Sequence, residues 1–307
     1  MVSCAFSSLT DEEFVRYSLA EGKRFQDSFE IIALLKRCFE AYNKNKTLRM
    51  ASYCGVQMAR EYFSINEFAD AKQILDNVAN LYRQEGWVAL LWEGLGYLRE
   101  CSRKTGSVKD FVEQSLEMAA LPVSNTEDAQ FFKDCGPAGP PSLLQREMIH
   151  KEVFGVIRGE SEIALNEENN HLKVTDCHPL YLEIDLVSPL RVALLASVAF
   201  HEQIIKPGRS TMLTVSLLTR LPLKFEIDQL EIQFNQTECN FIIINGQRPQ
   251  LAAISNVQPG RRVEMAPALE IATNKWLRLT YDIKSGKLVF SALFLSDEQV
   301  KVNQLPH

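Results

Sequence analysis

The first 120 residues repeat themselves with the hydrophobic spacing of α-helices, and no other feature limits the fold as strongly. In residues 25–42 the apolar side chains recur every three or four positions, which places them on one face of a helix (Phe25, Phe29, Ile32, Leu35 and Phe39). Residues 68–82 show the same spacing and align with the first segment at an offset of 43. Residues 107–121 align more weakly with residues 67–81, at an offset near 40.

A partner helix is expected ahead of the second and third copies, at residues 47–63 and 87–103. Gly55 and Gly96 take matching places in these two segments, 41 residues apart. A period near 40 with two helices per period is typical of α-solenoids. The sequence therefore predicts a helical solenoid of tetratricopeptide-like helix pairs over residues 1–121.

The stretch WVALLWEGLGYL (87–98) holds two tryptophans and two glycines inside an expected helix. Trp92, Leu95 and Gly96 fit the W-x2-L-G element of tetratricopeptide repeats. We expect a neighbouring helix to approach closely at Gly96 and the indole of Trp92 to fill the space beside it. Burial of one tryptophan stabilises by about 3 kcal/mol, which offsets the cost of a helical glycine, about 1 kcal/mol. Gly86 is expected to close the preceding helix.

Residues 122–170 are predicted to be a linker. Four prolines stand near its start, at positions 122, 137, 140 and 141. The segment 142–157 has an apolar pattern suited to a helix, with Ser142 as the N-cap residue directly after two prolines.

From residue 171 the apolar period changes to two, which is typical of strands. Alternating runs occupy residues 191–200 and 211–219, with Leu213, Val215 and Leu217 on one face of the second run. Two short runs flank Asp228-Gln229, a further run ends at Asn245-Gly246, and residues 276–295 form a hairpin pattern about Ser285-Gly286. The predicted fold class is α + β multidomain, with an antiparallel immunoglobulin-like β-sandwich over residues 171–307.

Composition and charge argue against several classes of protein. The net charge is -6, which argues against nonspecific nucleic-acid binding. The first residues lack the pattern of a secretory signal, and the longest apolar run, at 192–200, is about half the ~20 residues of a membrane helix. The seven cysteines are scattered and never form a CxxC pair, which favours free thiols in a reducing compartment.

No motif indicates catalysis, so we predict no catalytic, cofactor-binding or metal-ligating residue and no small-molecule substrate. HEQII (201–205) lacks the second histidine of H-E-x-x-H. A hydrolase with a site built from Asp176, His178 and His201 is the alternative from another class. A third hypothesis is a peripheral membrane-binding adaptor. NKNK (43–46) and GRR (260–262) are short basic segments, which could contact the phosphates of a membrane.

Two stretches resemble a known family. Residues 61–101 are similar to the end of the foie gras domain, which belongs to the large scaffold subunit, subunit 11, of the TRAPP (trafficking protein particle) complexes. Residues 216–241 are similar to the β-rich segment that follows that domain. The two stretches occur in the family's order, whereas residues 122–190 between them carry the resemblance least.

The resemblance implies a non-enzymatic scaffold in ER-to-Golgi transport and autophagy. It implies other TRAPP subunits as partners and, indirectly, Rab-type GTPases and Golgi membranes. The expected location is cytoplasmic, peripheral at ER–Golgi intermediate and cis-Golgi membranes. Family members are several times longer, so a partial chain is expected, with Phe14, Phe25 and Phe29 left partly exposed and available for self-association or a partner.

Overall fold

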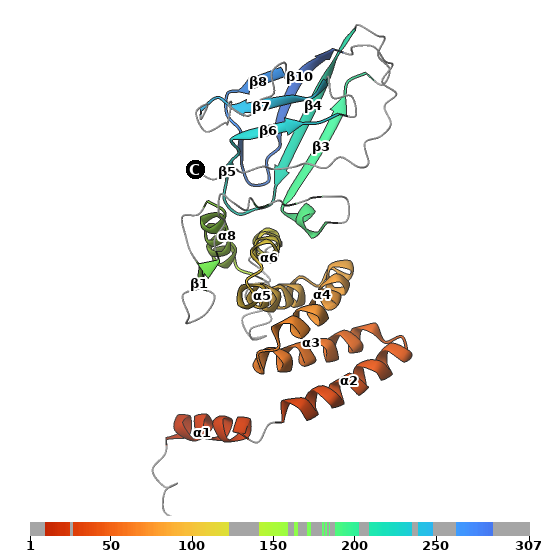
Figure 1. The fold of residues 1–307 in the computed structure, drawn as a ribbon, viewed down its shortest axis with the longest axis vertical. Helices are drawn as coiled ribbons and strands as arrows, with labels where there is room; N and C mark the ends of the chain where they lie inside the picture. The colour runs from red at the N-terminus through yellow and green to blue at the C-terminus, as the bar shows by residue number, and fades with distance from the viewer. Residues whose placement is uncertain are drawn as a thin grey trace, which may run out of the picture. The chain divides into compact units, whose positions relative to one another are not determined.

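The computed structural model describes residues 10–24, 27–122, 141–158, 163–164, 171–172, 180, 182, 184, 188–202, 209–234, 239–247 and 262–284. Among the described residues the last α-helix ends at residue 157 and the strands follow, which confirms a helical part succeeded by a β-rich part (Figure 1). By contacts the chain divides into two units, Met1–Val78 and Ala79–His307. This division falls inside a helix, α4, and the domain limits predicted at residues 121 and 170 stay a prediction.

The first unit holds α1 (Asp11–Arg24), α2 (Ser28–Lys44), α3 (Leu48–Ser64) and the start of α4 (Phe68–Glu85). α2 and α3 pack along each other. The predicted apolar face of α2 is correct at Ile32, which is buried, and at the half-buried Leu35 and Phe39. Phe29, at the margin of this face, is 74% exposed, as expected, because its side chain lies about 100° around the helix from the half-buried Ser28.

Helices α2 to α6 begin at strictly regular intervals. α5 (Val88–Thr105) and α6 (Val108–Ala120) continue the series in the second unit. The residues that directly precede the five helices stand 20 positions apart: Asp27, Thr47, Glu67, Trp87 and Ser107. Two helices therefore span 40 residues, which confirms the predicted period near 40.

The ends of α2 to α5 repeat as well. Residues 46, 66, 86 and 106 all have positive φ, and they are Lys46, Asn66, Gly86 and Gly106. At each end the next amide donates to a carbonyl five residues back, as from Thr47 to Tyr42 (2.9 Å) and from Trp87 to Tyr82 (3.0 Å). This is the Schellman pattern of helix termination. The prediction that Gly86 closes its helix is confirmed.

The caps also correct the predicted register of the repeat. With an offset of 40, Gly55 corresponds to Leu95 and not to Gly96. The predicted offsets of 41 and 43 matched residue types, whereas the helix ends set the true register.

The close approach predicted at Gly96 is wrong, and a close approach occurs at Gly55 instead. A Cβ atom on Gly96 would meet only Cε of Met118, at 4.0 Å, an ordinary contact. Met118, rather than the half-buried Trp92, lies beside Gly96. A Cβ atom on Gly55 would lie 3.1 Å from Cγ2 of Val78 and 3.5 Å from Cγ2 of Ile74. The missing Cβ of Gly55 thus lets α3 and α4 pack closely.

Substitution of these two glycines is expected to have opposite effects. Gly55→Val should lower the free energy of unfolding by about 1–3 kcal/mol, because the branched side chain overpacks the contact with Val78. Gly96→Ala should be neutral or stabilising by up to about 1 kcal/mol, since alanine is the better helix former. Urea unfolding of the two variants measures both, and equal stability of Gly55→Val and the wild type would contradict the assignment.

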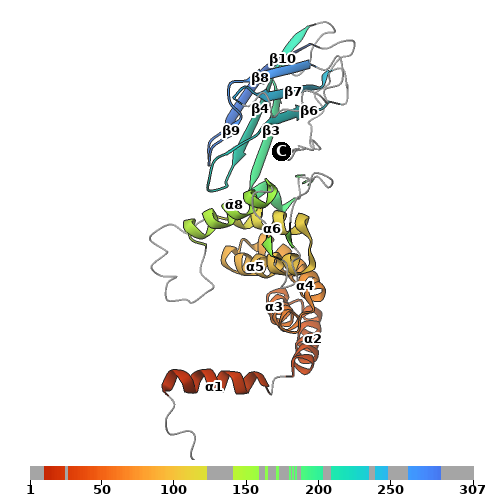
Figure 2. The same cartoon turned by 60° about the vertical axis from the view of Figure 1, so that its left-hand side comes forward.

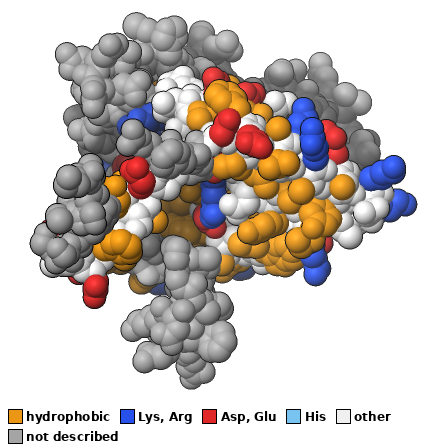
Figure 3. Space-filling view, turned by 90° about the horizontal axis from the view of Figure 1, so that it is seen from below, with side chains coloured by type: hydrophobic (Ala, Val, Ile, Leu, Met, Phe, Trp, Pro, Cys, Tyr) orange, Lys and Arg blue, Asp and Glu red, His pale blue; other side chains and the backbone are white. Residues whose placement is uncertain are grey.

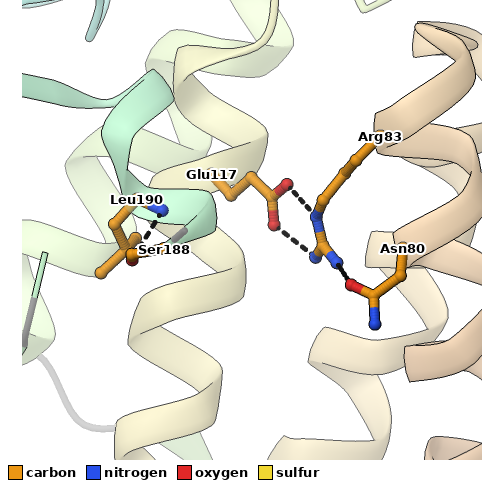
Figure 4. A network of polar contacts seen from close by, with 5 residues as sticks. All are labelled: Asn80, Arg83, Glu117, Ser188 and Leu190. Carbon is orange, nitrogen blue, oxygen red and sulfur yellow. Dashed lines mark hydrogen bonds and ion pairs between the residues drawn. The ribbon is translucent and has the colours of Figure 1, made fainter. Parts of the chain in front are cut away.

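A buried ion pair joins α4 to α6 within the second unit (Figure 4). The guanidinium of Arg83 binds both carboxylate oxygens of Glu117, with Nε 2.7 Å from Oε1 and Nη2 2.8 Å from Oε2. Its Nη1 donates to Oδ1 of Asn80 at 2.7 Å. Only 4% of the Glu117 side chain is exposed, so its charge depends on Arg83 for compensation.

Helix α8 (Leu143–Ile157) confirms the helix predicted over residues 142–157. The hydroxyl of Ser142 accepts from the amide of Gln145 (3.2 Å), and the side chain of Gln145 accepts from the amide of Ser142 (2.9 Å). This is the reciprocal capping box. α8 packs against α6.

The described residues of the β-rich part form short strands and the 3-10 helix η2 (Pro189–Val192). The strands are β1 (Ile163–Ala164), β2 (His171–Leu172), β3 (Leu194–Phe200), β4 (Ser210–Thr219), β5 (Phe225–Glu226), β6 (Gln229–Ile232), β7 (Phe241–Asn245), β8 (Arg262–Ala266), β9 (Glu270–Ile271) and β10 (Leu277–Lys284). Leu213, Val215 and Leu217 of β4 are at most 2% exposed, which confirms the predicted buried face. The second arm of the predicted hairpin, after Ser285-Gly286, lies outside the described residues.

Within the part of the chain that the structure describes, the strands form two sheets of three, β10-β4-β3 and β6-β7-β8, and the pairs β5-β9 and β1-β2. β7 and β8 run parallel, with Phe241 opposite Arg262 and Asn245 opposite Ala266. The prediction of a wholly antiparallel domain is therefore wrong at this pair.

Aromatic rings connect the two three-stranded sheets, whose strands Figure 2 shows from a second direction. Phe234, just after β6, lies 6.2 Å from Phe200 of β3 and 6.3 Å from Phe241 of β7, between ring centroids. Phe241 in turn lies 5.4 Å from Tyr281 of β10. This chain of rings packs the two sheets against each other.

Candidate partner-binding surface

Of the three side chains weighed for a hydrolytic site, the structure describes one. His201 follows β3 on an exposed face, with Nε2 2.9 Å from Oγ1 of Thr214. That hydroxyl lies 3.0 Å from Oγ1 of Thr280. Asp176 and His178 lie outside the described residues. Within the described ranges, no cluster of His, Cys, Asp and Glu could hold a metal ion, and none of the helices found there could cross a membrane.

Two side chains whose pKa values are lowered by burial, Arg146 and His150, lie where α8 contacts α6 and the chain after β4. Arg146 is 7% exposed, and it donates to the carbonyl oxygens of Ala119 (Nε, 2.6 Å) and Arg220 (Nη2, 2.8 Å). Burial lowers the pKa of Arg146. The guanidinium satisfies the last turn of α6, where the helix dipole favours a cation.

His150 lies one turn further along α8, and it is 4% exposed. Its ring stacks on Phe154 at 4.3 Å between centroids, and Phe154 lies 5.4 Å from Phe225 of β5. No described residue bonds to its buried Nδ1 atom. Burial, assisted by Arg158 and Lys151, lowers the pKa of His150 to about 4, so the imidazole is neutral at pH 7.

These side chains form a fixed contact between α8 and the β-rich part, and sequence reasoning missed it. A signal was present, because Arg146, His150 and Phe154 recur every four residues along α8. Their packing is that of a covered junction and not of an open site for a ligand.

The first unit carries exposed apolar side chains. On α2, Phe29 is 74% and Leu34 52% exposed. At the start of α3, Leu48 is 56%, Met50 46% and Tyr53 57% exposed. We call these five residues the α2–α3 surface. Figure 3 looks at the molecule from the α1 and α2 side and shows hydrophobic side chains gathered there among isolated acidic and basic ones.

Apolar side chains on the outside of a helix pair are suited to bind another protein. The predicted exposure is confirmed for Phe29 and for Phe14 of α1, which is 55% exposed, and Phe25 lies outside the described residues. Sequence reasoning missed Leu34, Leu48, Met50 and Tyr53. Lys44 and Lys46, at the turn before α3, are exposed beside Leu48, which gives this end of the surface a positive charge.

Comparison with known proteins gives one family match, over the helical part of the chain, and several relatives. Residues 2–121 match the model of Foie gras liver health family 1. Over 131 residues the chain is 39% identical to trafficking protein particle complex subunit 11 of Gallus gallus, and 30% identical to the proteins of that name in Homo sapiens and Bos taurus. Each match spans 43% of this chain and 10% of the length of the relative.

Proposed function

We propose, on the premise that residues 2–121 form a Foie gras domain, that the chain acts as a non-enzymatic scaffold subunit of a trafficking protein particle complex. The observation that carries the proposal is the likeness of this chain, over 131 residues, to subunit 11 of that complex in three vertebrates. Its partners would be other subunits of the complex.

The finer parts of the proposal follow the same premise. The complex would act in ER-to-Golgi transport and in autophagy, from a cytoplasmic position at ER–Golgi intermediate and cis-Golgi membranes. Rab-type GTPases and Golgi membranes would be indirect partners. The helices would form a tetratricopeptide-like solenoid, joined to an immunoglobulin-like β domain.

The α2–α3 surface supports a role in protein–protein contact. Its side chains are exposed to between 46% and 74%, although each would gain about 1.5–3 kcal/mol from full burial. On the exposed side of α2, Leu34 has a polar neighbour one turn before it, Glu30. A partner that covers Phe29 and Leu34 would therefore bind through an apolar centre with a polar rim.

The test is affinity purification of the full chain from cells, followed by identification of the co-purifying subunits. The variant Phe29→Asp/Leu34→Gln removes the apolar side chains of α2. An acidic residue in the first turn suits the helix dipole, so the helix should persist. Arg37→Ala, an exposed polar position on the same helix, is the matched control.

We expect the wild type and Arg37→Ala to retain subunits of the trafficking protein particle complex, and the double variant to lose them by about tenfold or more. Circular dichroism checks that the helices remain. If the wild type retains none of these subunits, the proposed function is wrong. If the double variant retains them as well as the wild type, only the assignment of the surface is wrong.

Peripheral membrane binding is the second candidate function, and one observation favours it. Leu48 and Met50 are exposed next to Lys44 and Lys46, and basic side chains beside apolar ones suit an anionic membrane surface. Flotation with anionic liposomes at low and high salt is the test. Binding that disappears in Lys44→Glu/Lys46→Glu supports this candidate, and absence of flotation at low salt removes it.

A further inference from the structure

Strand β3 has an open edge among the described residues. It is the outermost strand of the sheet β10-β4-β3 and pairs there with β4 alone (Figure 1). Leu194, at its start, is buried, whereas Ala196, Ser197 and Ala199 are exposed. Another strand could therefore reach the backbone of β3.

The hydrogen bonds to β4 identify which backbone groups face this edge. The carbonyl of Ala193 accepts from the amide of Arg220 (3.1 Å), and the amide of His201 donates to the carbonyl of Met212 (2.9 Å). Hydrogen-bonded and non-hydrogen-bonded pairs alternate in an antiparallel ladder, so the odd-numbered residues bond to β4. The even-numbered residues, such as Ala196 and Val198, direct their N–H and C=O groups away from β4.

β3 differs from the other edge strands of the two three-stranded sheets, because its sequence, LLASVAF, has no charge and no proline. β10 contains Arg278, Asp282 and Lys284, β6 contains Glu231, and β8 contains Arg262 and Glu264. Charged residues on an edge strand hinder the addition of a further strand. Only β3, among the described edges of these sheets, lacks that protection.

The sequence of β3 also complements itself. In an antiparallel pair of two β3 strands centred on Ser197, Val198 lies opposite Ala196 and Leu195 opposite Ala199, so that a larger side chain meets a smaller one. In this register Ala196 of one strand and Val198 of the other would exchange both backbone hydrogen bonds, which matches the direction of their free groups. Ser197 would lie opposite Ser197 of the other copy.

We propose that β3 is a docking edge for a second copy of this chain, which pairs antiparallel to it about Ser197 and joins two three-stranded sheets into one of six strands. The pairing is closed by a two-fold axis and leaves the other edge of each sheet, β10, on the outside. This inference is independent of the proposed function.

The first test is sedimentation of the full chain over a range of concentrations. Ser197→Lys places two like charges directly opposite each other across the pair, which should raise the dimer Kd by about tenfold or more. Ser216→Lys is the matched control, because Ser216 is the β4 residue opposite Ser197 and points to the same face, but lies on an interior strand. We expect Ser216→Lys to dimerise like the wild type.

The second test is a disulfide across the pair. Ser197 would form a non-hydrogen-bonded pair with its copy, with Cα atoms about 4.5 Å apart, close enough for a disulfide. Under mild oxidation Ser197→Cys should give a covalent dimer, in which peptide mapping finds the two copies of β3 joined by a disulfide, and Ser216→Cys should not. A monomer at all concentrations, a dimer unaffected by Ser197→Lys, or cross-linking equal in the two cysteine variants would each overturn the proposal.

Discussion

Glu117→Ala is expected to lower the free energy of unfolding by about 3–5 kcal/mol, the largest effect that the structure indicates for one side chain. The substitution leaves the guanidinium of Arg83 without its bidentate partner while it is only 24% exposed. It also opens a space in α6 between buried neighbours such as Met118. Urea unfolding followed by circular dichroism measures the change.

A surface ion pair on the same helix provides the control. Lys109 and Glu113 lie 3.8 Å apart, with 58% of the Lys109 side chain exposed, so Lys109→Ala should cost no more than about 0.5 kcal/mol. The double variant Arg83→Met/Glu117→Leu should recover much of the loss, because apolar side chains often replace a buried ion pair without cost. Equal stability of Glu117→Ala and Lys109→Ala would show that the ion pair between Arg83 and Glu117 contributes nothing to the free energy of unfolding.

When the pH is lowered from 6.5 to 4, protonation of His150 alone is expected to reduce the free energy of unfolding by about 3 kcal/mol. Its pKa is lowered to about 4 in the folded state, first by burial and then by Arg158 and Lys151, whereas an unfolded histidine has a pKa near 6.5. Between these values the unfolded chain binds the proton and the folded chain does not. Folding is therefore favoured at the higher pH, and this contribution is lost as the pH falls.

His150→Leu separates this contribution from that of the carboxylates. Leucine binds no proton at this position. Between pH 6.5 and 4 the free energy of unfolding of the variant should therefore fall by about 3 kcal/mol less than that of the wild type. His201→Leu, at an exposed position, is the control. Identical pH dependence of His150→Leu and the wild type would mean that the histidine is not held neutral at the junction.

Local features of the chain could be predicted from the sequence because they depend on neighbouring residues. Helix α8 follows from its apolar spacing and from Ser142, whose hydroxyl caps the helix. Gly86 ends α4 because a glycine adopts positive φ without cost, and its φ is 71°. The buried face of β4 is visible in the alternation of Leu213, Val215 and Leu217.

The candidate surface could be predicted only in part. The sequence indicates the exposure of Phe14 and Phe29, but not that of Leu34, Leu48, Met50 and Tyr53. An apolar residue on a helix looks the same in sequence whether a neighbour covers it or not. Which side of α2 meets α3 is decided by packing, and that decision leaves Phe29 and Leu34 outside.

The two hydrophobic periods, read from the sequence alone, determined that a helical part precedes a β-rich part, and the alignment of the helical segments with one another determined a repeat near 40. Only the tertiary structure decided that Gly55 and not Gly96 marks a close helix contact, that β7 and β8 are parallel, and that Arg146 and His150 are buried together. The reason is that periodicity and caps act between residues a few positions apart. Contacts such as that of Arg146 with the carbonyl of Arg220 join residues far apart in the chain, and their partners are selected by the packing of whole elements.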